Sequence, residues 1–448
     1  MPFVFNTVLS ICLKILEVVF TFEKTTAVKK LAFLFFICFS SLVSAQKSAD
    51  TAQVKIPGRV NSATTLTQPY VILISSDGFR YDYLKKYNTQ YLLDFAENGV
   101  WAKKGMYPTY PSITFPNHYS IATGLYPAHH GIVDNKFYDP KRNEMYALGS
   151  KSILDGSWYG GEPFWSLAEK QGMMAASLFW VGSESDAGGM RPSYYYKYHE
   201  KFTDDDKVRI IKGWLTLPEE VRPHFITLYF PEVDHMGHKY GPDAPQTEES
   251  VHYVDTAINK LVKALQPLNL PINYIFVSDH GMIGVEKKDL VPMPAIDPEK
   301  YVVVNSGTFA RITAKNKADI LPLYQSLKNS KPKDYRIYLA QNFPRKLHYS
   351  TREDTTRRIG DIILVPKGAK SLIDVGKKTS YGKHGFDPCK VPEMKATFIA
   401  WGPAFDSPKK IKPFTNIHIY PMIADILGLN VTQPIDGKLD VLKKILKK

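Results

Sequence analysis

Short apolar runs alternate with helical stretches along the chain from Tyr70 onward. The runs are rich in residues that favour strands, and they are Val71–Ser75, Ala175–Val181, Phe225–Phe230, Tyr274–Val277, Asp361–Val365 and Thr397–Trp401. One set of apolar residues between two of these runs recurs at helical spacing and predicts a helix facing a sheet: Val251, Val254, Ile258, Leu261, Val262 and Leu265. This alternation is typical of an α/β fold in which helices cover both faces of a mostly parallel central sheet.

The rest of the chain departs from this alternation in a few places. Residues 46–68 are polar and mixed, which predicts a linker before a single domain over residues 69–440. The stretch Tyr301–Ser350 interrupts the pattern, so we expect a small inserted lobe near 301–350. Residues 441–448 are rich in lysine and are expected to form a frayed basic tail.

The N-terminal segment, residues 1–45, has the pattern of an export signal. A basic pair, Lys29 and Lys30, precedes the apolar run Leu31–Leu42, and small residues follow up to Ala45. We therefore expect cleavage between Ala45 and Gln46 and export, most naturally to the periplasm. Residues 1–28 fit an overextended start. The alternative is an N-terminal membrane tether, which the charged residues interrupting the first apolar stretch make weaker.

Charge and cysteine content narrow the class of protein only slightly. The 57 Lys and Arg residues outnumber the 44 Asp and Glu residues, which gives a formal charge of +13. A basic balance suits anionic substrates, but it equally suits solubility. Of the three cysteines, Cys12 and Cys38 lie in the N-terminal segment and only Cys389 lies beyond it. The mature chain therefore has no internal disulfide, which argues against a disulfide-stapled ectoprotein but not against export.

Acidic residues follow three of the predicted strands. Asp77 follows the first run, Asp234 follows Phe225–Phe230, and Asp279 with His280 follows the run that ends at Val277. Ligands in open α/β sheets bind beyond the carboxyl ends of the strands, so these side chains are expected to share one site. A single Asp in such a position is usually a turn or cap residue, but three together, two with a nearby His, favour a metal site.

Two further histidines fit the same site. His238 is separated from Asp234 by three residues, and Gly237 between them is expected to bend the backbone so that both side chains face one ion. His384 lies in a glycine-flanked loop, where a lone histidine is more often structural. The remaining candidates are interpreted as structural or solvated: His118, His129, His130 and His235.

Thr114 is a candidate nucleophile because it lies at a predicted helix start. Pro116 fits the first turn of that helix, which would leave free backbone N–H groups beside Thr114. The alternative is that Thr114 is only the residue that caps the helix.

The order of these motifs resembles that of the nucleotide pyrophosphatase/phosphodiesterase family, in the alkaline phosphatase superfamily. The resemblance covers roughly residues 70–430 and rests on Ser76–Arg80, Thr114–His118, Gly124–Pro127, His130–Asn135, Asp234–His238, Ser278–Met282, Gly382–Gly385 and Asn416–Pro421. It implies an alkaline-phosphatase-like three-layer sandwich. The chain is similar to the compact bacterial form of the family, because it shows neither cysteine-rich modules nor a nuclease-like domain, and we expect no Ca²⁺ site of the kind that domain carries.

The resemblance also implies two Zn²⁺ ions and a role for each matching residue. One ion would be held by Asp234, His238 and His384, and the other by Asp77, Asp279, His280 and the Thr114 oxygen. Thr114 would attack phosphorus to give a phosphothreonine that water then hydrolyses. Asn135 would hydrogen-bond a non-bridging phosphate oxygen, and its alternative role is that of a turn residue.

The same resemblance points to a small-molecule nucleotide substrate that is cut to a nucleoside 5′-monophosphate. Phe115 matches the first of two aromatic residues that hold the base, and Tyr198 matches the second within a register of a few residues. These aromatics could equally be packing residues. We expect no specific nucleic-acid partner and no protein partner.

Three alternatives remain open from the sequence. A phosphate monoesterase of the superfamily would place Lys and Arg two residues apart, and the segment Trp180–Arg191 has no such pair. A glycerophosphodiester or choline-phosphate phosphodiesterase would need a cage for a quaternary ammonium group. A metal-binding or surface-recognition protein without turnover would need no intact nucleophile.

Overall fold

The computed structural model describes residues 52–447. The predicted signal segment, its cleavage position and the possible membrane tether lie outside these residues. The main sheet has nine strands in the order β1-β7-β6-β8-β2-β9-β18-β3-β19. In chain order these strands are β1 Val54–Lys55, β2 Tyr70–Ser76, β3 Val100–Trp101, β6 Ala175–Leu178, β7 Tyr194–Tyr196, β8 Phe225–Phe230, β9 Ile272–Val277, β18 Phe398–Trp401 and β19 Lys409–Lys410.

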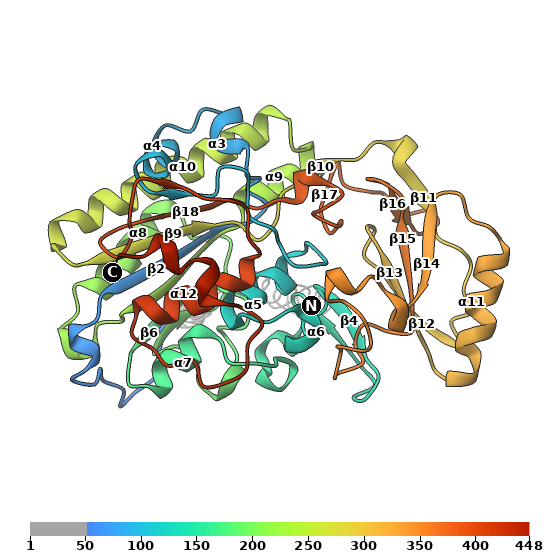
Figure 1. The fold of residues 1–448 in the computed structure, drawn as a ribbon, viewed down its shortest axis with the longest axis horizontal. Helices are drawn as coiled ribbons and strands as arrows, with labels where there is room; N and C mark the ends of the chain where they lie inside the picture. Colours follow the sequence, from blue (N-terminus) through green and yellow to red (C-terminus); the bar gives the residue numbers. More distant parts are fainter. Residues whose placement is uncertain (1–51, 448) are drawn as a thin grey trace, which may run out of the picture. The chain divides into compact units, whose positions relative to one another are not determined.

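The five strands β7, β6, β8, β2 and β9 are parallel neighbours, which confirms the predicted α/β class with a mostly parallel sheet. Helices cover both faces (Figure 1). The described α-helices, of which α11 belongs to a second sheet, are α3 Tyr83–Lys86, α4 Gln90–Asn98, α5 Thr114–Thr123, α6 Pro127–His130, α7 Phe164–Lys170, α8 Asp204–Leu215, α9 Glu232–Tyr240, α10 Pro245–Leu265, α11 Ile320–Asn329 and α12 Ile419–Ile426. No helix in this described part of the chain is both long and apolar enough to cross a membrane.

Strand β2 is buried on both faces, which explains its continuous apolar run. Val71 and Leu73 pack into a core that includes side chains of α5, α7 and α12, whereas Ile72 and Ile74 pack into a second core with α4, α8 and α10. All four are fully buried. The sheet therefore separates two apolar layers, as expected for a parallel sheet.

Helix α10 confirms the predicted helical stripe. Val251, Val254, Ile258, Leu261 and Leu265 are buried against the sheet, and Val262 lies at the edge of the same cluster. The helix begins with Pro245 in its first turn, where the missing N–H of proline costs no hydrogen bond.

A second, four-stranded antiparallel sheet has the order β12-β13-β15-β14 and packs with α11. Its strands are β12 Tyr301–Asn305, β13 Ala310–Ala314, β14 Tyr335–Leu339 and β15 Ile362–Pro366. It extends beyond the predicted lobe of 301–350, and β15 corrects the assignment of Asp361–Val365 to the central sheet. Ile363 contributes to the main core while Ile362 and Leu364 contribute to a separate core under α11. Burial on both faces gave this strand the same apolar run as a central strand.

Three two-stranded sheets complete the described β-sheets: β4 Lys136–Asp139 with β5 Glu144–Ala147, β10 Ile283–Gly284 with β17 Gly382–Lys383, and β11 Leu290–Pro292 with β16 Ser371–Ile373. The run Thr397–Trp401 also differs from its prediction in orientation. Strand β18 is antiparallel to both neighbours, β9 and β3. An apolar run carries no information about strand direction, so the sequence could not reveal this.

Both predicted irregular ends are packed where the structure describes them. In the predicted linker, Val54 pairs with Tyr195, and the Asn61 amide donates to two backbone carbonyls. In the predicted basic tail, Ile445 is fully buried and the Lys447 N–H donates to the carbonyl of Ala404 at 2.9 Å. Leu442 of the same segment is 1% exposed, so two apolar side chains anchor it among the lysines and it is not a frayed tail.

Candidate metal centre and nucleophile

The three predicted acidic strand ends meet at one edge of the central sheet. Strand β2 lies between β8 and β9, and Asp77 directly follows it. Asp279 and His280 follow β9, and Asp234 lies in α9, just after β8. All four side chains are at most 8% exposed. Because the strands are parallel, their carboxyl ends deliver these groups to a shared place.

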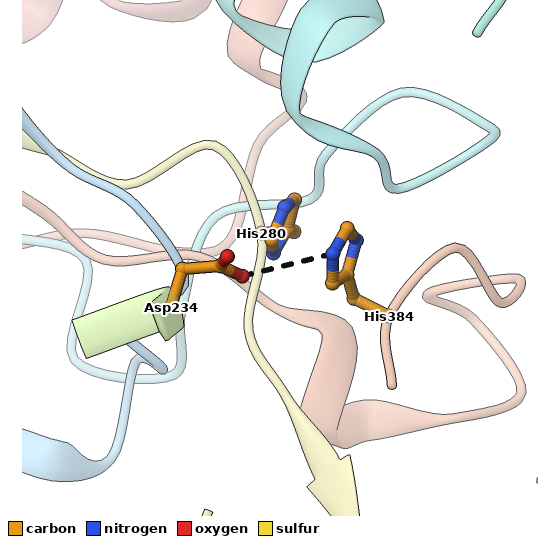
Figure 2. A group of neighbouring side chains, drawn as sticks. All are labelled: Asp234, His280 and His384. Carbon is orange, nitrogen blue, oxygen red and sulfur yellow. Dashed lines mark ion pairs between the residues drawn. The ribbon is translucent and has the colours of Figure 1, made fainter. Parts of the chain in front are cut away.

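The side chains form two groups of the kind that holds metal ions. In the first, the Nε2 atoms of His238 and His384 lie 3.5 and 3.6 Å from Asp234 Oδ1, and 3.0 Å from each other. Figure 2 shows the Asp234 carboxylate pointing toward the rings of His280 and His384. These contacts join the residues that the sequence predicted as one ligand set.

In the second group, His280 Nε2 lies 3.4 Å from Asp77 Oδ1 and 3.0 Å from Asp279 Oδ2. The Thr114 hydroxyl lies 3.3 Å from the same nitrogen. The two groups adjoin each other, because the rings of His280 and His384 stack with centroids 3.6 Å apart.

The imidazoles are oriented so that their Nε2 lone pairs face the carboxylates. The Nδ1–H of His238 donates to the carbonyl of Gly382 at 2.8 Å, and that of His384 to the carbonyl of Ser112 at 3.0 Å. A carbonyl only accepts, so each Nδ1 carries the proton in the neutral ring and each Nε2 is a lone pair. Two lone pairs 3.0 Å apart repel each other unless a cation lies between them.

Three buried carboxylate oxygens of these two groups lack a hydrogen-bond donor among the described residues, and they are Asp77 Oδ1, Asp234 Oδ1 and Asp279 Oδ2. These are the atoms that face the Nε2 lone pairs. Zinc takes nitrogen and oxygen ligands at 2.0–2.2 Å in tetrahedral geometry, which sets neighbouring ligand atoms about 3.3 Å apart. The spacing, the donor types and the missing hydrogen bonds all fit Zn²⁺.

Electrostatics in both groups also favour a cation. Burial raises the pKa of Asp77 well above its usual value, and the charges of Asp279 and Asp234 raise it further. Burial alone would raise the pKa of Asp279, but the imidazoles of His280 and His118 hold it at about 2. Burial lowers the pKa of His384, and His280 and His238 lower it further, so this ring stays neutral, as a metal ligand must be.

The Asp234–His238 motif is helical, which corrects the predicted bend at Gly237. Both residues lie in α9, where positions four apart share one face. Close packing here depends on Gly382 rather than on Gly237, where an added Cβ would meet the Met282 side chain at 3.2 Å. A Cβ on Gly382 would lie 2.3 Å from the Gly237 carbonyl oxygen, so the two backbone segments approach each other closely at these glycines.

A second close approach occurs at Gly78, directly after Asp77. Its φ is +67°, and a Cβ there would lie 3.0 Å from the Cα of Asp234. The N–H of Gly78 donates to Asp279 Oδ1 at 3.2 Å. Any larger residue would separate the carboxylates that the site brings together.

Thr114 is the first residue of α5, and Ile113 occupies the cap position. The Thr114 side chain makes no capping hydrogen bond. The N–H of Phe115 donates to the Asn135 side-chain oxygen at 2.8 Å. That hydrogen bond fixes the amide so that its NH₂ group remains available as a donor beside Thr114.

The two predicted base-binding aromatics do not contact each other in the part of the chain that the structure describes. Phe115 is 9% exposed and packs edge-on against Tyr146. Tyr198 is 39% exposed, and its ring lies 6.0 Å from that of Tyr229. Tyr198 is therefore available at the surface beside the second group, whereas Phe115 is mostly packed.

Sequence reasoning missed several residues that support the site. The Tyr229 hydroxyl donates to Asp77 Oδ2 at 2.6 Å, from within an apolar strand. His118 is fully buried, and its Nδ1 lies 2.9 Å from the Thr114 carbonyl and 3.4 Å from Asp279. Arg311 of the second sheet pairs with Asp134, next to Asn135, at 2.6 Å. The polar atom of Tyr229 inside its strand was the one available signal.

The other histidines have the structural or solvated positions that were predicted. His130 is fully buried and lies 3.0 Å from the Ser120 hydroxyl. His129 pairs with Asp436 at 2.7 Å, and His235 is exposed.

Comparison with known proteins finds relatives over most of the chain. The family described as type I phosphodiesterase / nucleotide pyrophosphatase matches residues 71–387. The chain is 34% identical over 392 residues to human ectonucleotide pyrophosphatase/phosphodiesterase family member 1, covering 85% of this chain and 42% of the human one. It is 35% identical over 401 residues to an uncharacterised pyrophosphatase/phosphodiesterase of Schizosaccharomyces pombe, covering 85% and 81%.

A solved structure is similar as well. Murine ectonucleotide pyrophosphatase/phosphodiesterase 5, in an inactive form in complex with AMP, superposes with a TM-score of 0.78 at 27% identity. The match covers 85% of this chain and 100% of that one, whose fold is the same alkaline-phosphatase-like α/β architecture. The chain therefore belongs to the type I phosphodiesterase/nucleotide pyrophosphatase family.

Proposed function

We propose that this protein is a two-zinc hydrolase that cuts phosphodiester or pyrophosphate bonds of small nucleotides and releases nucleoside 5′-monophosphates. The observation that carries the proposal is the position of Thr114. Its hydroxyl lies 3.3 Å from His280 Nε2, beside two adjoining sets of ligands in which one oxygen of each aspartate lacks a donor. A free threonine hydroxyl is a poor nucleophile, so it needs such surroundings to attack phosphorus.

Asp234, His238 and His384 would hold one Zn²⁺, and Asp77, Asp279, His280 and the Thr114 oxygen would hold the other. When bound, zinc supplies positive charge that favours an alkoxide over a hydroxyl and stabilises charge on phosphate oxygens. Three aspartates balance only part of the charge of two zinc ions. The surplus favours an anionic substrate.

The protein's own groups would orient the reaction. The helix start at Thr114 holds the attacking oxygen at one place, and the Asn135 NH₂ group donates to a non-bridging phosphate oxygen. The Thr114 oxygen forms a bond to phosphorus as the bond to the leaving oxygen breaks, which gives a phosphothreonine. Water then hydrolyses it and restores Thr114. Tyr198, and Phe115 to a smaller extent, would stack on the base.

Cleavage of diesters rather than monoesters is supported by the segment before Arg191. In this segment, the side chain that lies near Tyr198 is that of Glu184. Its carboxylate accepts a hydrogen bond from the Tyr198 N–H at 2.7 Å. A carboxylate here gives no grip on a dianionic phosphate. The AMP bound to the murine relative is consistent with a nucleotide as the preferred small molecule.

A turnover panel tests the proposal. It compares ATP, a dinucleotide polyphosphate, a UDP-sugar, glycerophosphocholine, bis-p-nitrophenyl phosphate and p-nitrophenyl phosphate, before and after chelation and zinc return. We expect nucleotides to be turned over best, and Thr114→Ala to lower kcat on the order of 10³-fold or more because the nucleophile is lost.

Thr114→Ser is the matched control, since it keeps the hydroxyl and should retain part of the activity. Preference for p-nitrophenyl phosphate would identify a monoesterase, and preference for glycerophosphocholine would identify a glycerophosphodiesterase. Zinc binding without hydrolysis of any compound would leave a binding protein. Each of these results contradicts the proposal.

We also propose that residues 1–45 direct export to the periplasm. Cell fractionation and N-terminal sequencing of the exported protein test this. A start at Gln46 is expected, and retention of residues 1–45 in a membrane fraction would identify a tether instead.

A further inference from the structure

Asn117 is fully buried in the first turn of α5, three residues after the candidate nucleophile. Its side-chain amide donates both hydrogens to backbone carbonyls that precede the helix, that of Pro111 at 2.8 Å and that of Ile113 at 2.9 Å. Its oxygen accepts from the Thr109 N–H at 2.7 Å and from the Thr109 hydroxyl at 2.9 Å. One side chain therefore fastens the segment 109–113, which leads into the nucleophile.

The orientation of this amide is fixed by the groups that surround it. The side-chain NH₂ of Asn416 also donates to the Asn117 oxygen, at 2.9 Å. A backbone N–H and an amide NH₂ can only donate, whereas the carbonyls on the opposite side can only accept. Turning the amide by about 180° would place donors against donors and acceptors against acceptors, so only one orientation satisfies all of these groups.

Asn416 connects this cluster with the segment that precedes α12. It is fully buried, and its own backbone N–H donates to the Tyr107 carbonyl at 3.0 Å. The motifs Thr114–His118 and Asn416–Pro421, which lie far apart in the sequence, therefore meet at these two asparagines. The proposed reaction gives neither asparagine a role.

The segment 109–113 belongs to no helix or strand, so these side-chain hydrogen bonds fix its course. It carries Ser112, whose carbonyl accepts the Nδ1–H of His384 at 3.0 Å. The Ser112 hydroxyl donates to the Phe386 carbonyl at 2.7 Å and accepts from the Gly385 N–H at 3.1 Å. The segment therefore joins the nucleophile to the loop that presents one of the proposed zinc ligands.

We infer that Asn117 is a positioning residue that holds the Thr114 oxygen and the His384 ring in their places relative to each other. The inference rests on the proposed function. Without the amide, the Thr109 N–H loses its partner and the backbone on both sides of Ser112 is free to move. A displacement of about 1 Å at an attacking atom lowers a rate about 100-fold. Because Asn117 is fully buried, its removal acts on the chemical step and not on contacts with the nucleotide.

The experiment measures Asn117→Ala in excess zinc, with the nucleotide that the wild type turns over best. Near-UV circular dichroism gives the folded fraction by which the activity is divided. We expect kcat per folded molecule to fall about 100-fold, because the nucleophile is misplaced, while KM changes less than about threefold. A kcat equal to that of the wild type would overturn the inference, since Asn117 would then serve only the fold. A loss confined to KM would overturn it too.

Asn61→Ala is the matched control, because Asn61 is a buried asparagine with the same kind of contacts elsewhere. Its amide donates to the carbonyls of Glu219 and Arg222 at 2.8 and 2.7 Å and accepts from the Met174 N–H at 2.8 Å. These contacts lie at the amino ends of β6 and β8, at the opposite edge of the sheet from the site. The control should lose stability but keep its kcat per folded molecule. Equal losses of kcat in both variants would mean general destabilisation and would refute the inference.

Thr109→Val is a milder variant that decides the question if Asn117→Ala does not fold. It keeps the shape of the side chain and removes only the hydroxyl that donates to the Asn117 oxygen, while the backbone N–H stays in place. We expect kcat to fall about fivefold, as for the loss of one buried hydrogen bond. An unchanged kcat would contradict the positioning role.

Zinc affinity is a readout that does not depend on turnover. Competition with a chromophoric chelator should give a zinc dissociation constant about tenfold higher for Asn117→Ala than for the wild type, because the Ser112 carbonyl no longer fixes the His384 ring. An unchanged constant would refute the inference. A wild type that hydrolyses no nucleotide would refute the proposed function, while the zinc constants would still decide whether Asn117 orients His384.

Discussion

At the scale of single residues, the site depends on groups that hold the ligands as much as on the ligands. Asp77 has one hydrogen-bond donor among the described residues, the Tyr229 hydroxyl, and its other oxygen faces His280. That hydrogen bond fixes which carboxylate oxygen points into the site. Groups of this kind commonly change metal affinity when they are removed.

Tyr229→Phe removes this donor while keeping the ring in place. We expect its zinc affinity to fall about tenfold, because the Asp77 carboxylate becomes free to rotate away. Competition with a chromophoric zinc chelator measures the affinity. Tyr194→Phe is the control, since its hydroxyl donates to the Val221 carbonyl on the same sheet but away from the site. Equal affinity for wild type and Tyr229→Phe would contradict the prediction.

Sequence alone predicted which acidic and histidine side chains lie together at the candidate site, but not the residues that hold them in place. Asp77, Asp234 and Asp279 could be predicted because each follows an apolar strand, and strand ends meet at one edge. Tyr229 and Arg311 could not, because a tyrosine in a strand and an arginine in a lobe have many ordinary uses. Their roles depend on a contact between segments distant in the sequence.

At the scale of elements, strand β13 of the second sheet supports the loop that carries Asn135. The Arg311 guanidinium donates to Asp134 and to the Lys136 carbonyl, both at 2.6 Å, and it is 2% exposed. A buried ion pair contributes little relative to an apolar pair, but removing one partner leaves a buried charge. The second sheet is therefore coupled to the loop that carries Asn135, for which we propose a contact with phosphate.

Arg311→Met should lower the free energy of unfolding by about 3 kcal/mol, because it leaves the Asp134 carboxylate buried without its counter-ion. Urea unfolding followed by tryptophan fluorescence measures the loss. Adding Asp134→Asn to this variant should recover part of it, since the uncompensated charge disappears. A double variant that is less stable by the sum of both single losses would show that the two residues do not interact.

The prediction of an element was confirmed where its sequence pattern fits only one kind of structure. The α10 stripe fits only a helix packed on one face, and it was confirmed. The run Asp361–Val365 has two meanings, because a strand buried between two cores in the second sheet looks the same in sequence as a central strand. Strand direction at β18 was equally invisible, since an antiparallel strand buried on both faces keeps the same run.

At the scale of the whole molecule, hydrogen bonds join segments of the described fold that are far apart in sequence. The backbone N–H groups of Asp436 and Gly437 donate to the Gly124 carbonyl at the end of α5, at 3.0 and 2.9 Å. The Asp436 carboxylate accepts from the Tyr126 N–H at 2.8 Å and from His129 at 2.7 Å. The chain beyond α12 is thus tied to the helix that begins with Thr114.

This tie makes stability depend on pH in a defined direction. The hydrogen bond to Asp436 raises the pKa of His129 above 6.5, despite partial burial. Its contribution to stability is therefore fully present below the unfolded pKa and is lost as pH rises through the folded pKa. Burial alone would raise the pKa of Asp436, but His129 and the Tyr126 N–H lower it below 3.8, so its contribution is lost only as pH falls through that lower value. Both groups therefore contribute fully to stability between pH 3.8 and pH 6.5, the ordinary pKa values of the two side chains.

His129→Gln should therefore lower Tm more at about pH 6 than at about pH 9, because the wild-type ion pair exists only at the lower of these values. Thermal unfolding of both proteins at equal zinc concentration measures the two differences. His235→Gln replaces an exposed histidine and should show no such pH-dependent gap. If the Tm difference between wild type and His129→Gln stays constant from pH 6 to pH 9, the histidine stabilises the fold by packing and not by a charge paired with Asp436.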